Sequence, residues 1–259
     1  MSSSASRALR ILEFVAAADE PPGVTAIARA LSLSPATVFR ALDALSRADL
    51  VARYQASSRY VPGPAAERLS RTLIAHFPMR EIALPYLRQL ASVSGDTTSL
   101  HVRIGWYAVR IASVTGDAQV TYAPPLGGAA ALGENYAGRA ILAFLDAAEW
   151  ARYDDWAAKH EAPRADERDL RAIRDEGFAL GEPQGADGRA AVAFPIRTRD
   201  TAAAALTIDT PALHVPPHAG AYALKDWREI VSELESIGQS QPSLFETPFA
   251  HLDPDSIVL

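Results

Sequence analysis

The stretch that most constrains this chain is Val24 to Arg47, because it predicts two short helices joined by a tight turn. The apolar residues of the first helix recur at i, i+3, i+4 and i+7, as Val24, Ile27, Ala28 and Leu31. Ser34 and Pro35 favour the start of the second helix, since Ser is a good N-cap and Pro suits the first helical position. Val38, Leu42 and Leu45 form the apolar face of that second helix.

The opposite face of the second helix favours DNA binding. Small and hydrogen-bonding residues let a helix enter a major groove, and an Arg can reach a guanine edge or a phosphate. The residues expected to contact DNA from this helix are Ser34, Ala36, Thr37 and Arg40. A simple pair of helices in any helical domain fits the same pattern, so the motif needs structural context.

The flanking segments supply that context. A helix is predicted from Arg7 to Ala18, after residues 1–6 that are expected to be disordered. Residues 49–54 and 59–62 predict two short strands around a polar turn, which completes the element order of a winged helix. The hairpin residues expected near phosphates or the minor groove are Arg53, Gln55, Ser57 and Arg59. For Arg59 a solvated hairpin charge is an equal alternative.

Length and composition limit the number of domains and the classes of protein that this chain can belong to. The 259 residues suffice for one large or two ordinary domains, and 49% hydrophobic with 22% charged residues is a globular mixture. No apolar run is long enough for a transmembrane helix, and the N-terminal sequence lacks the apolar block of a signal peptide, so a cytoplasmic protein without membrane partners is expected. The absence of Cys excludes disulfides and cysteine metal sites. The net charge is −6, yet residues 1–77 hold nine Arg against six acidic residues, so a basic module sits within an acidic chain.

The remaining chain predicts an α+β domain with an antiparallel sheet, because its strands and helices do not alternate as βαβ units. Helices are expected at 63–77, 81–94, 136–145, 146–160, 166–176 and 224–237, and strands at 97–104, 107–114, 120–122, 178–180, 190–197 and 202–209. Residues 239–259 form a tail with apolar residues, for which docking on the body or on a partner chain and disorder are both open.

From about Arg7 to about Ile237, the chain resembles the IclR family of transcription regulators. The first part of the resemblance lies in RALRILEFVA, IARALSLSPATVFRALDAL and YVPGP. The second lies in AGRAILAFL (137–145), which is similar to the family's AGKAxLAxL helix, and in EGFAL followed by AVAFPI and AALTID. The resemblance implies a winged helix-turn-helix domain at 1–62, a linker helix at 63–78, a GAF-like effector-binding domain at 79–238 and a tail at 239–259.

The resemblance also implies a cup for a small molecule, often an organic or aromatic acid, between the sheet and the loop before helix 137–145. The free N–H groups at the start of that helix are suited to a carboxylate. On this side the implied effector-binding residues are Tyr122, Leu132, Asn135, Tyr136, Ala137 and Gly138. On the far side they are Gly181, Ala191, Thr207 and Asp209. Plain core packing is an equal alternative for Tyr122 and for the neighbouring candidate Trp106.

The chain departs from the family pattern at several of these positions. Gly133 stands where relatives often have His, and Gly181 and Ala191 stand where they offer Asp and Cys. These smaller side chains predict a roomier pocket and therefore a bulkier, partly aromatic effector. Asp209 would repel an anion, so it is expected either to accept from a ligand hydroxyl or amide or merely to end a strand.

Three function classes remain in competition. The favoured one is a repressor of a catabolic operon, which binds a palindromic operator on double-stranded DNA as a homodimer or homotetramer and responds to the effector. The alternative is a ligand-independent DNA-binding or interaction protein. A hydrolytic enzyme is least favoured, because no GxSxG, HExxH or P-loop is present. His214 and His218 are separated by two prolines and cannot form a helical metal pair, so no cofactor or metal is expected.

Overall fold

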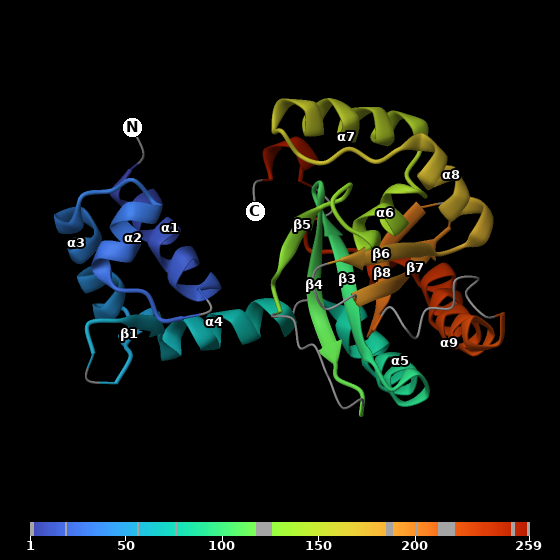
Figure 1. The fold of residues 1–259 in the computed structure, drawn as a ribbon, viewed down its shortest axis with the longest axis horizontal. Helices are drawn as coiled ribbons and strands as arrows, with labels where there is room; N and C mark the ends of the chain where they lie inside the picture. The colour runs from blue at the N-terminus through green and yellow to red at the C-terminus, as the bar shows by residue number, and fades with distance from the viewer. Residues whose placement is uncertain are drawn as a thin grey trace. The chain divides into compact units, whose positions relative to one another are not determined.

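The structure is a computed structural model that describes residues 3–18, 20–55, 57–75, 77–117, 126–184, 189–199, 201–211, 221–249 and 252–257. The chain divides into two compact units, residues 1–76 and residues 77–259 (Figure 1). Within the described ranges, no helix combines the length and the apolar character needed to cross a bilayer.

The first unit is a winged helix. Its elements are α1 (Ser4–Ala17), α2 (Val24–Ala30), α3 (Pro35–Arg47), β1 (Val51–Arg53), β2 (Tyr60–Pro62) and α4 (Pro64–Ala75). Strands β1 and β2 pair antiparallel, with Ala52 opposite Val61. The predicted helix-turn-helix and hairpin are therefore confirmed within one or two residues at each end.

One small core holds the winged helix together. It combines Ile11 and Val15 from α1, Ile27 from α2, and Val38 and Leu42 from α3, each at most 2% exposed. The prediction of disorder before Arg7 was wrong for the residues that the structure describes. Helix α1 begins at Ser4 because the Ser3 side chain accepts a hydrogen bond from the Ser6 N–H, which caps the helix.

The prediction for Phe77 was also wrong in part. The sequence placed this ring on the linker helix, whereas α4 ends at Ala75 and Phe77 is buried in the core of the second unit. Pro78 is the first residue of the next helix, a position where its missing N–H costs nothing.

The second unit contains a six-stranded antiparallel sheet in the order β5-β4-β3-β8-β7-β6. Its strands are β3 (Thr97–Ile104), β4 (Tyr107–Val114), β5 (Ala129–Ala131), β6 (Ala179–Gln184), β7 (Arg189–Thr198) and β8 (Thr201–Pro211). Its helices are α5 (Pro78–Ser94), α6 (Tyr136–Leu142), α7 (Ala147–Lys159), α8 (Glu167–Glu176) and α9 (Ala221–Ser240), with short 3₁₀ turns η2 (Pro242–Phe245) and η3 (Pro254–Ser256). The predicted α+β class is confirmed.

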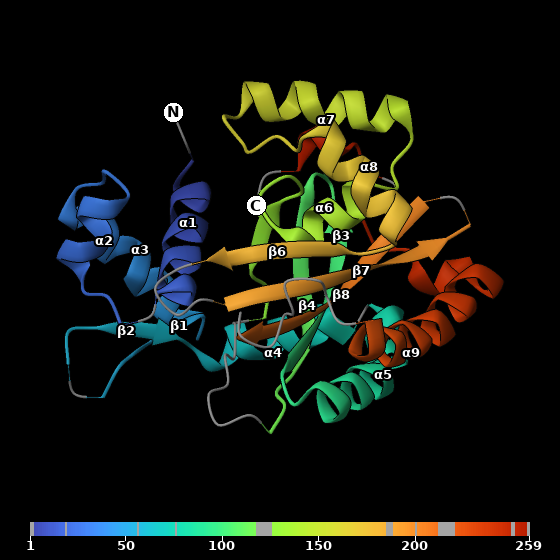
Figure 2. The same ribbon diagram turned by 45° about the vertical axis from the view of Figure 1, so that its right-hand side comes forward.

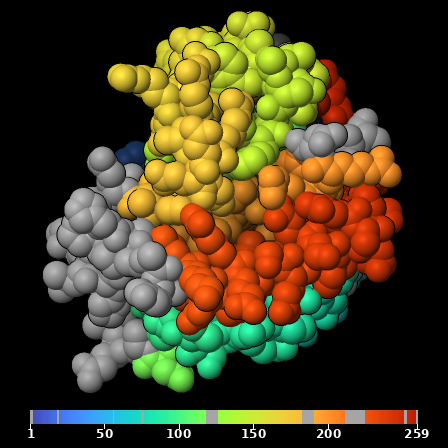
Figure 3. Space-filling model, turned by 90° about the vertical axis from the view of Figure 1, so that its right-hand side faces the viewer, coloured from blue at the N-terminus to red at the C-terminus, as the bar shows by residue number. Residues whose placement is uncertain are grey.

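The helices cover the two faces of the sheet separately. Figures 1 and 2 show α5 and α9 on one face and α6, α7 and α8 on the other, and Figure 3 shows α9 between α5 and α8 at the surface. Leu100 and Val102 of β3 pack with α5 and α9. Side chains alternate along a strand, so Ser99 and His101 belong to the face that α6 covers.

Some details of the second unit differ from the prediction, and others lie outside the described residues. Strand β5 was not foreseen, because three alanines carry no strand signal. Helix α6 ends at Leu142 instead of residue 145. The predicted strand at 120–122 and the His214–His218 pair lie outside the described residues.

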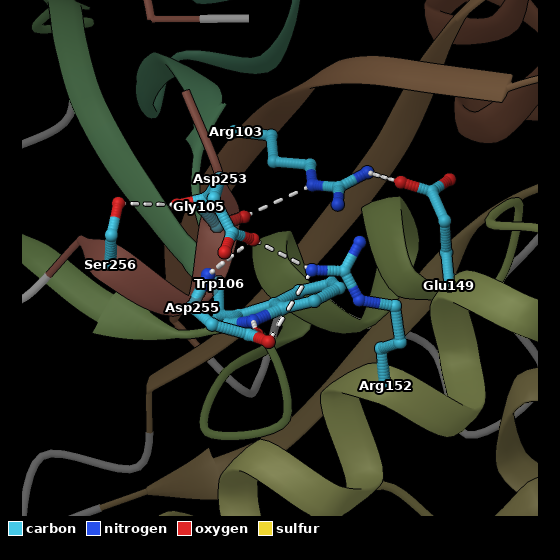
Figure 4. Close-up of polar contacts among 8 residues, drawn as sticks. All are labelled: Arg103, Gly105, Trp106, Glu149, Arg152, Asp253, Asp255 and Ser256. Carbon is cyan, nitrogen blue, oxygen red and sulfur yellow. Dashed lines mark hydrogen bonds and ion pairs between the residues drawn. The ribbon is translucent and has the colours of Figure 1, made fainter. Parts of the chain in front are cut away.

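The C-terminal tail docks on the second unit. Phe245 is fully buried in the core with α5 and α9. Figure 4 shows the end of the tail against the β3–β4 turn and α7. The Trp106 indole N–H donates to Asp255 Oδ1 at 2.6 Å, and Arg152 donates to Asp253 at 2.7 Å and to Asp255 at 3.3 Å. The sequence left docking and disorder open for this tail. In the structure, the described part of the tail docks on the body of the second unit.

These contacts predict how the tail responds to substitution. The hydrogen bond from Trp106, and then the one from Arg152, lowers the pKa of Asp255. Because a lowered carboxyl pKa stabilises the ionised form, the contact is present at neutral pH and is lost as the pH falls through that pKa. We expect Asp255→Ala to speed amide hydrogen exchange across residues 252–257 at neutral pH. The exposed Asp226→Ala is the control, and equal exchange in the two variants would contradict the prediction.

Candidate nucleic-acid interface and ligand site

Helix α3 presents a free face opposite its buried one. Ser34, Ala36 and Arg40 are exposed, and Thr37 is half-buried. The Ser34 hydroxyl caps the helix by accepting from the Thr37 N–H at 3.2 Å, and it shares a 2.8 Å hydrogen bond with the Thr37 hydroxyl. Ala36 and Arg40 are therefore the predicted residues of α3 whose side chains stand clear of this cap in the first turns, where recognition helices contact bases.

The hairpin holds its polar residues in a fixed turn. Arg53, Gln55 and Arg59 are exposed. The Ser57 hydroxyl donates to the Tyr54 carbonyl at 2.6 Å and accepts from the Arg59 N–H at 3.2 Å, so Ser57 shapes the turn itself. The Arg59 guanidinium lies 3.6 Å from Glu20, an ion pair between exposed side chains. Such a pair contributes little stability and leaves the cation accessible to a phosphate.

The strand pairing brings the far-side ligand residues onto one face. Opposite one another across the sheet lie Thr97, Asp209, Ala191 and Gly181. The neighbouring row is Ser113, Ser99, Thr207, Ala193 and Ala179, and the next is Arg110, His101, Ala205 and Pro195. The four far-side residues implied by the resemblance thus lie in two adjacent rows, on the side that α6 covers.

Tyr136 connects α6 to this face. Its hydroxyl donates to Asp209 Oδ1 at 2.7 Å. A Cβ added to Gly181 would clash with the Tyr136 ring, which shows that the ring lies directly on this glycine. The expectation that Gly181 leaves a roomier pocket was therefore wrong for this conformation, because the ring takes the space that the missing side chain leaves. Asp209 has a specific acceptor role and does not merely end a strand.

The start of α6 offers fewer backbone donors than the sequence suggested. The Asn135 side chain accepts from the Gly138 N–H at 2.9 Å and caps the helix. Gly138 is therefore not available to a carboxylate, which corrects the expectation for that residue. Leu132 and Ala137 are fully buried in the core beneath α6. Tyr122 lies outside the described residues.

Gly133 is explained by the packing around it. Its N–H donates to the Tyr153 hydroxyl at 2.6 Å, and that hydroxyl donates to the Pro163 carbonyl at 2.7 Å. A Cβ at this position would clash with the Pro163 carbonyl and lie 2.7 Å from the Tyr153 oxygen. A His side chain has no room here, so Tyr153 and Gly133 form one matched feature of the loop before α6.

The α6-facing side of β3 and β4 carries polar residues that the sequence did not identify as ligand candidates. Ser99 and Ser113 share a hydrogen bond of 3.2 Å, and His101 Nε2 lies 3.4 Å from the Thr207 hydroxyl. Burial, and then the charge of Arg110, lowers the pKa of His101 to about 3, so its imidazole is neutral at physiological pH. Only strand register identifies this cluster, because its members come from three separate segments.

Trp106 is a core residue, in line with the packing alternative that the sequence left open for it. Its ring is fully buried, and the guanidinium carbons of Arg103 and Arg152 lie 4.9 Å and 5.7 Å from its centre. No group of three or more His, Cys, Asp or Glu suited to a metal occurs within the described ranges.

A winged helix with an exposed Arg on its second motif helix, followed by a domain with an antiparallel sheet, is the architecture expected of a DNA-binding transcription regulator with a ligand domain. The family model for the IclR helix-turn-helix domain matches residues 4–54, and that for the C-terminal domain of bacterial IclR transcriptional regulators matches residues 71–235. The chain therefore belongs to the IclR family, which is a family of transcription regulators and not of enzymes.

Individual relatives agree with this assignment. The chain is 27% identical to the HTH-type transcriptional regulator BhcR of Paracoccus denitrificans over 81% of this chain and 77% of that protein. It is 28% identical to the HTH-type transcriptional repressor AllR of Escherichia coli over 52% of this chain and 50% of that protein.

Solved structures share the fold. An IclR transcriptional regulator from Alicyclobacillus acidocaldarius aligns with a TM-score of 0.73 and 25% identity, over 91% of this chain and 98% of that one. An IclR homologue from Microbacterium hydrocarbonoxydans, complexed with 4-hydroxybenzoate, aligns with a TM-score of 0.70 and 18% identity, over 92% and 100%.

Proposed function

We propose that this regulator represses a catabolic operon and that a hydroxylated aromatic acid, bound in the second unit, relieves the repression. The observation that carries the ligand proposal is the polar cluster buried between the sheet and α6. Burying a polar group costs free energy unless the group is hydrogen-bonded. A cluster of such groups on the sheet face that the seven-residue helix α6 covers therefore does not serve stability best, which supports a binding function for the cluster. The relative AllR of Escherichia coli is a transcriptional repressor, which supports repression as the sign of regulation.

The contact between Tyr136 and Asp209 indicates the ligand's chemistry. In the structure, the phenolic hydroxyl of Tyr136 donates to this carboxylate. When Tyr136 turns away from Gly181, a ligand ring can take its place and its hydroxyl can make the same bond. The remaining proposed contacts are Tyr122, Leu132, Asn135, Ala137, Ala191 and Thr207. The complex of the Microbacterium homologue with 4-hydroxybenzoate supports this ligand class.

The DNA-binding assembly follows from the first unit. Ser34, Ala36, Thr37 and Arg40 are proposed to meet the major groove, and Arg53, Gln55, Ser57 and Arg59 the flanking backbone or minor groove. Leu9, Leu69 and Leu73 are more than half exposed on α1 and α4, which supports an apolar contact between two copies of this unit. A two-fold dimer reads a palindromic operator, and pairing through the second units extends it to a tetramer. Helix α4 is proposed to carry the signal, provided that the ligand binds one arrangement more tightly.

A mobility-shift experiment tests the proposal. The probe is DNA from beside the protein's own gene, with and without 4-hydroxybenzoate, benzoate, pyruvate and glyoxylate. We expect a specific shift that the hydroxylated aromatic acid weakens most. A specific shift that no acid changes would favour the ligand-independent alternative, and preferential release by pyruvate or glyoxylate would contradict the aromatic class. Thermal unfolding with each acid provides an independent binding readout, since a ligand of the folded state raises the melting temperature.

A further inference from the structure

Arg110 is a half-buried arginine of the second unit whose guanidinium has no partner among the residues that the structure describes. Its Nε atom is buried, and neither a hydrogen bond nor an ion pair joins its guanidinium to any of the described residues. Its main chain is held firmly, since the Arg110 N–H donates to Gly128 at 3.0 Å and its carbonyl accepts from Gly127 at 2.8 Å. A half-buried cation without an anion lowers the stability of a fold, so its presence calls for a functional reason.

His101 lies directly opposite Arg110 across the β3–β4 ladder and shows the same deficit. Its side chain is only 3% exposed, and its Nδ1 atom has no hydrogen-bond partner among the described residues. The other nitrogen, Nε2, faces Thr207. Two adjacent polar side chains on the α6-facing side of the sheet therefore have unused donor capacity, and one of them is permanently charged.

We propose that Arg110 and His101 form an anion-binding subsite that holds the carboxylate of the effector. The inference rests on the proposed function and refines it, because it moves the carboxylate from the start of α6 to β3 and β4. The neutral imidazole adds an N–H donor, and the guanidinium supplies the charge and several further donors. Asp209 and Tyr136 lie two rows away and bind the hydroxyl end, which keeps the acidic side chain apart from the ligand's own carboxylate.

Arg103 provides a matched control on the same strand face as His101. In contrast to Arg110, its guanidinium has partners: it pairs with Glu149 at 2.8 Å and donates from Nε to the Gly105 carbonyl at 3.0 Å (Figure 4). Replacing either Arg with Met keeps much of the side-chain volume and removes the charge. The two substitutions should therefore act in opposite directions on stability.

The experiment compares full-length wild type, Arg110→Met and Arg103→Met. Without ligand, we expect Arg110→Met to raise the melting temperature of the second unit by about 2–4 °C and Arg103→Met to lower it. With 4-hydroxybenzoate and benzoate, measured by calorimetry, we expect Arg110→Met to lose at least tenfold in affinity and Arg103→Met to retain it. 4-Hydroxybenzamide, a neutral analogue, should bind wild type and Arg110→Met equally.

Each contrary outcome has a distinct meaning. A destabilised or unfolded Arg110→Met would show that the cation is structural and would overturn the inference. Equal acid binding by wild type and Arg110→Met would place the carboxylate elsewhere, overturning the inference while leaving the proposed function intact. Failure of wild type to bind any of these probes would overturn both.

Discussion

Replacing Arg40 with Ala is expected to weaken operator binding about tenfold to a hundredfold, or roughly 1.4–2.8 kcal/mol. The residue is exposed on α3, whose opposite face is anchored in the core by Val38 and Leu42. Loss of its side chain removes a groove contact without disturbing that core. Mobility shift or fluorescence anisotropy at fixed salt measures the change, since phosphate contacts make affinity salt-dependent.

The control for Arg40 is Arg47→Ala. Arg47 lies on the same side of α3 two turns later and forms an ion pair with Asp43. The first turns of a recognition helix contact the bases, so this substitution should change operator affinity much less. Neither variant should change the melting-temperature shift caused by 4-hydroxybenzoate. A loss of that shift in Arg40→Ala would mean that the DNA and ligand sites have been assigned to the wrong units.

Replacing Gly138 with Ala is expected to destabilise the second unit by about 1–3 kcal/mol or more. A Cβ at this position would clash with the Leu132 carbonyl and lie 2.6 Å from the Leu132 Cα, both of which are backbone atoms. Helix α6 must then move off the loop before it, and the Asn135 cap opens. Thermal unfolding gives the loss, and hydrogen exchange across residues 132–142 should accelerate well beyond that of the rest of the unit.

Gly177→Ala separates this clash from the general effect of losing a glycine. Gly177 ends α8 with a φ of +79°, and no atom lies within 4 Å of an added Cβ. Its substitution strains the backbone alone, so stability should fall while exchange in residues 132–142 stays as in wild type. If both variants loosen that segment equally, the packing of α6 on Leu132 is not what holds the ligand domain together.

The winged helix could be predicted because its signals are local. Ser34 and Pro35 start α3, and the spacing of Val38, Leu42 and Leu45 sets its buried face. The helix cap and the apolar spacing are both set by residues within one or two helical turns, so contacts with distant segments do not change the outcome. The prediction of disorder at Ser3 and Ser4 was wrong because it overlooked a local signal of the same kind. The Ser3 side chain caps α1.

The ligand site could be predicted only in outline. The resemblance supplied Gly181, Ala191, Thr207 and Asp209, and strand pairing places them together on one face. The occupation of the space over Gly181 by Tyr136 was not foreseeable, because these residues are far apart in the chain and no periodic pattern links them.

The sequence by itself determined the class of each unit, since helix caps, apolar spacing and strand alternation are properties of neighbouring residues. Only the tertiary structure decided which polar groups have partners. The sequence shows Arg103 and Arg110 only as two arginines in adjacent strands. In the structure, Arg103 forms an ion pair with Glu149, whereas none of the described residues forms an ion pair with Arg110. Pairing depends on strand register and on helices distant in the chain, and the free energy of a buried charge depends on that pairing.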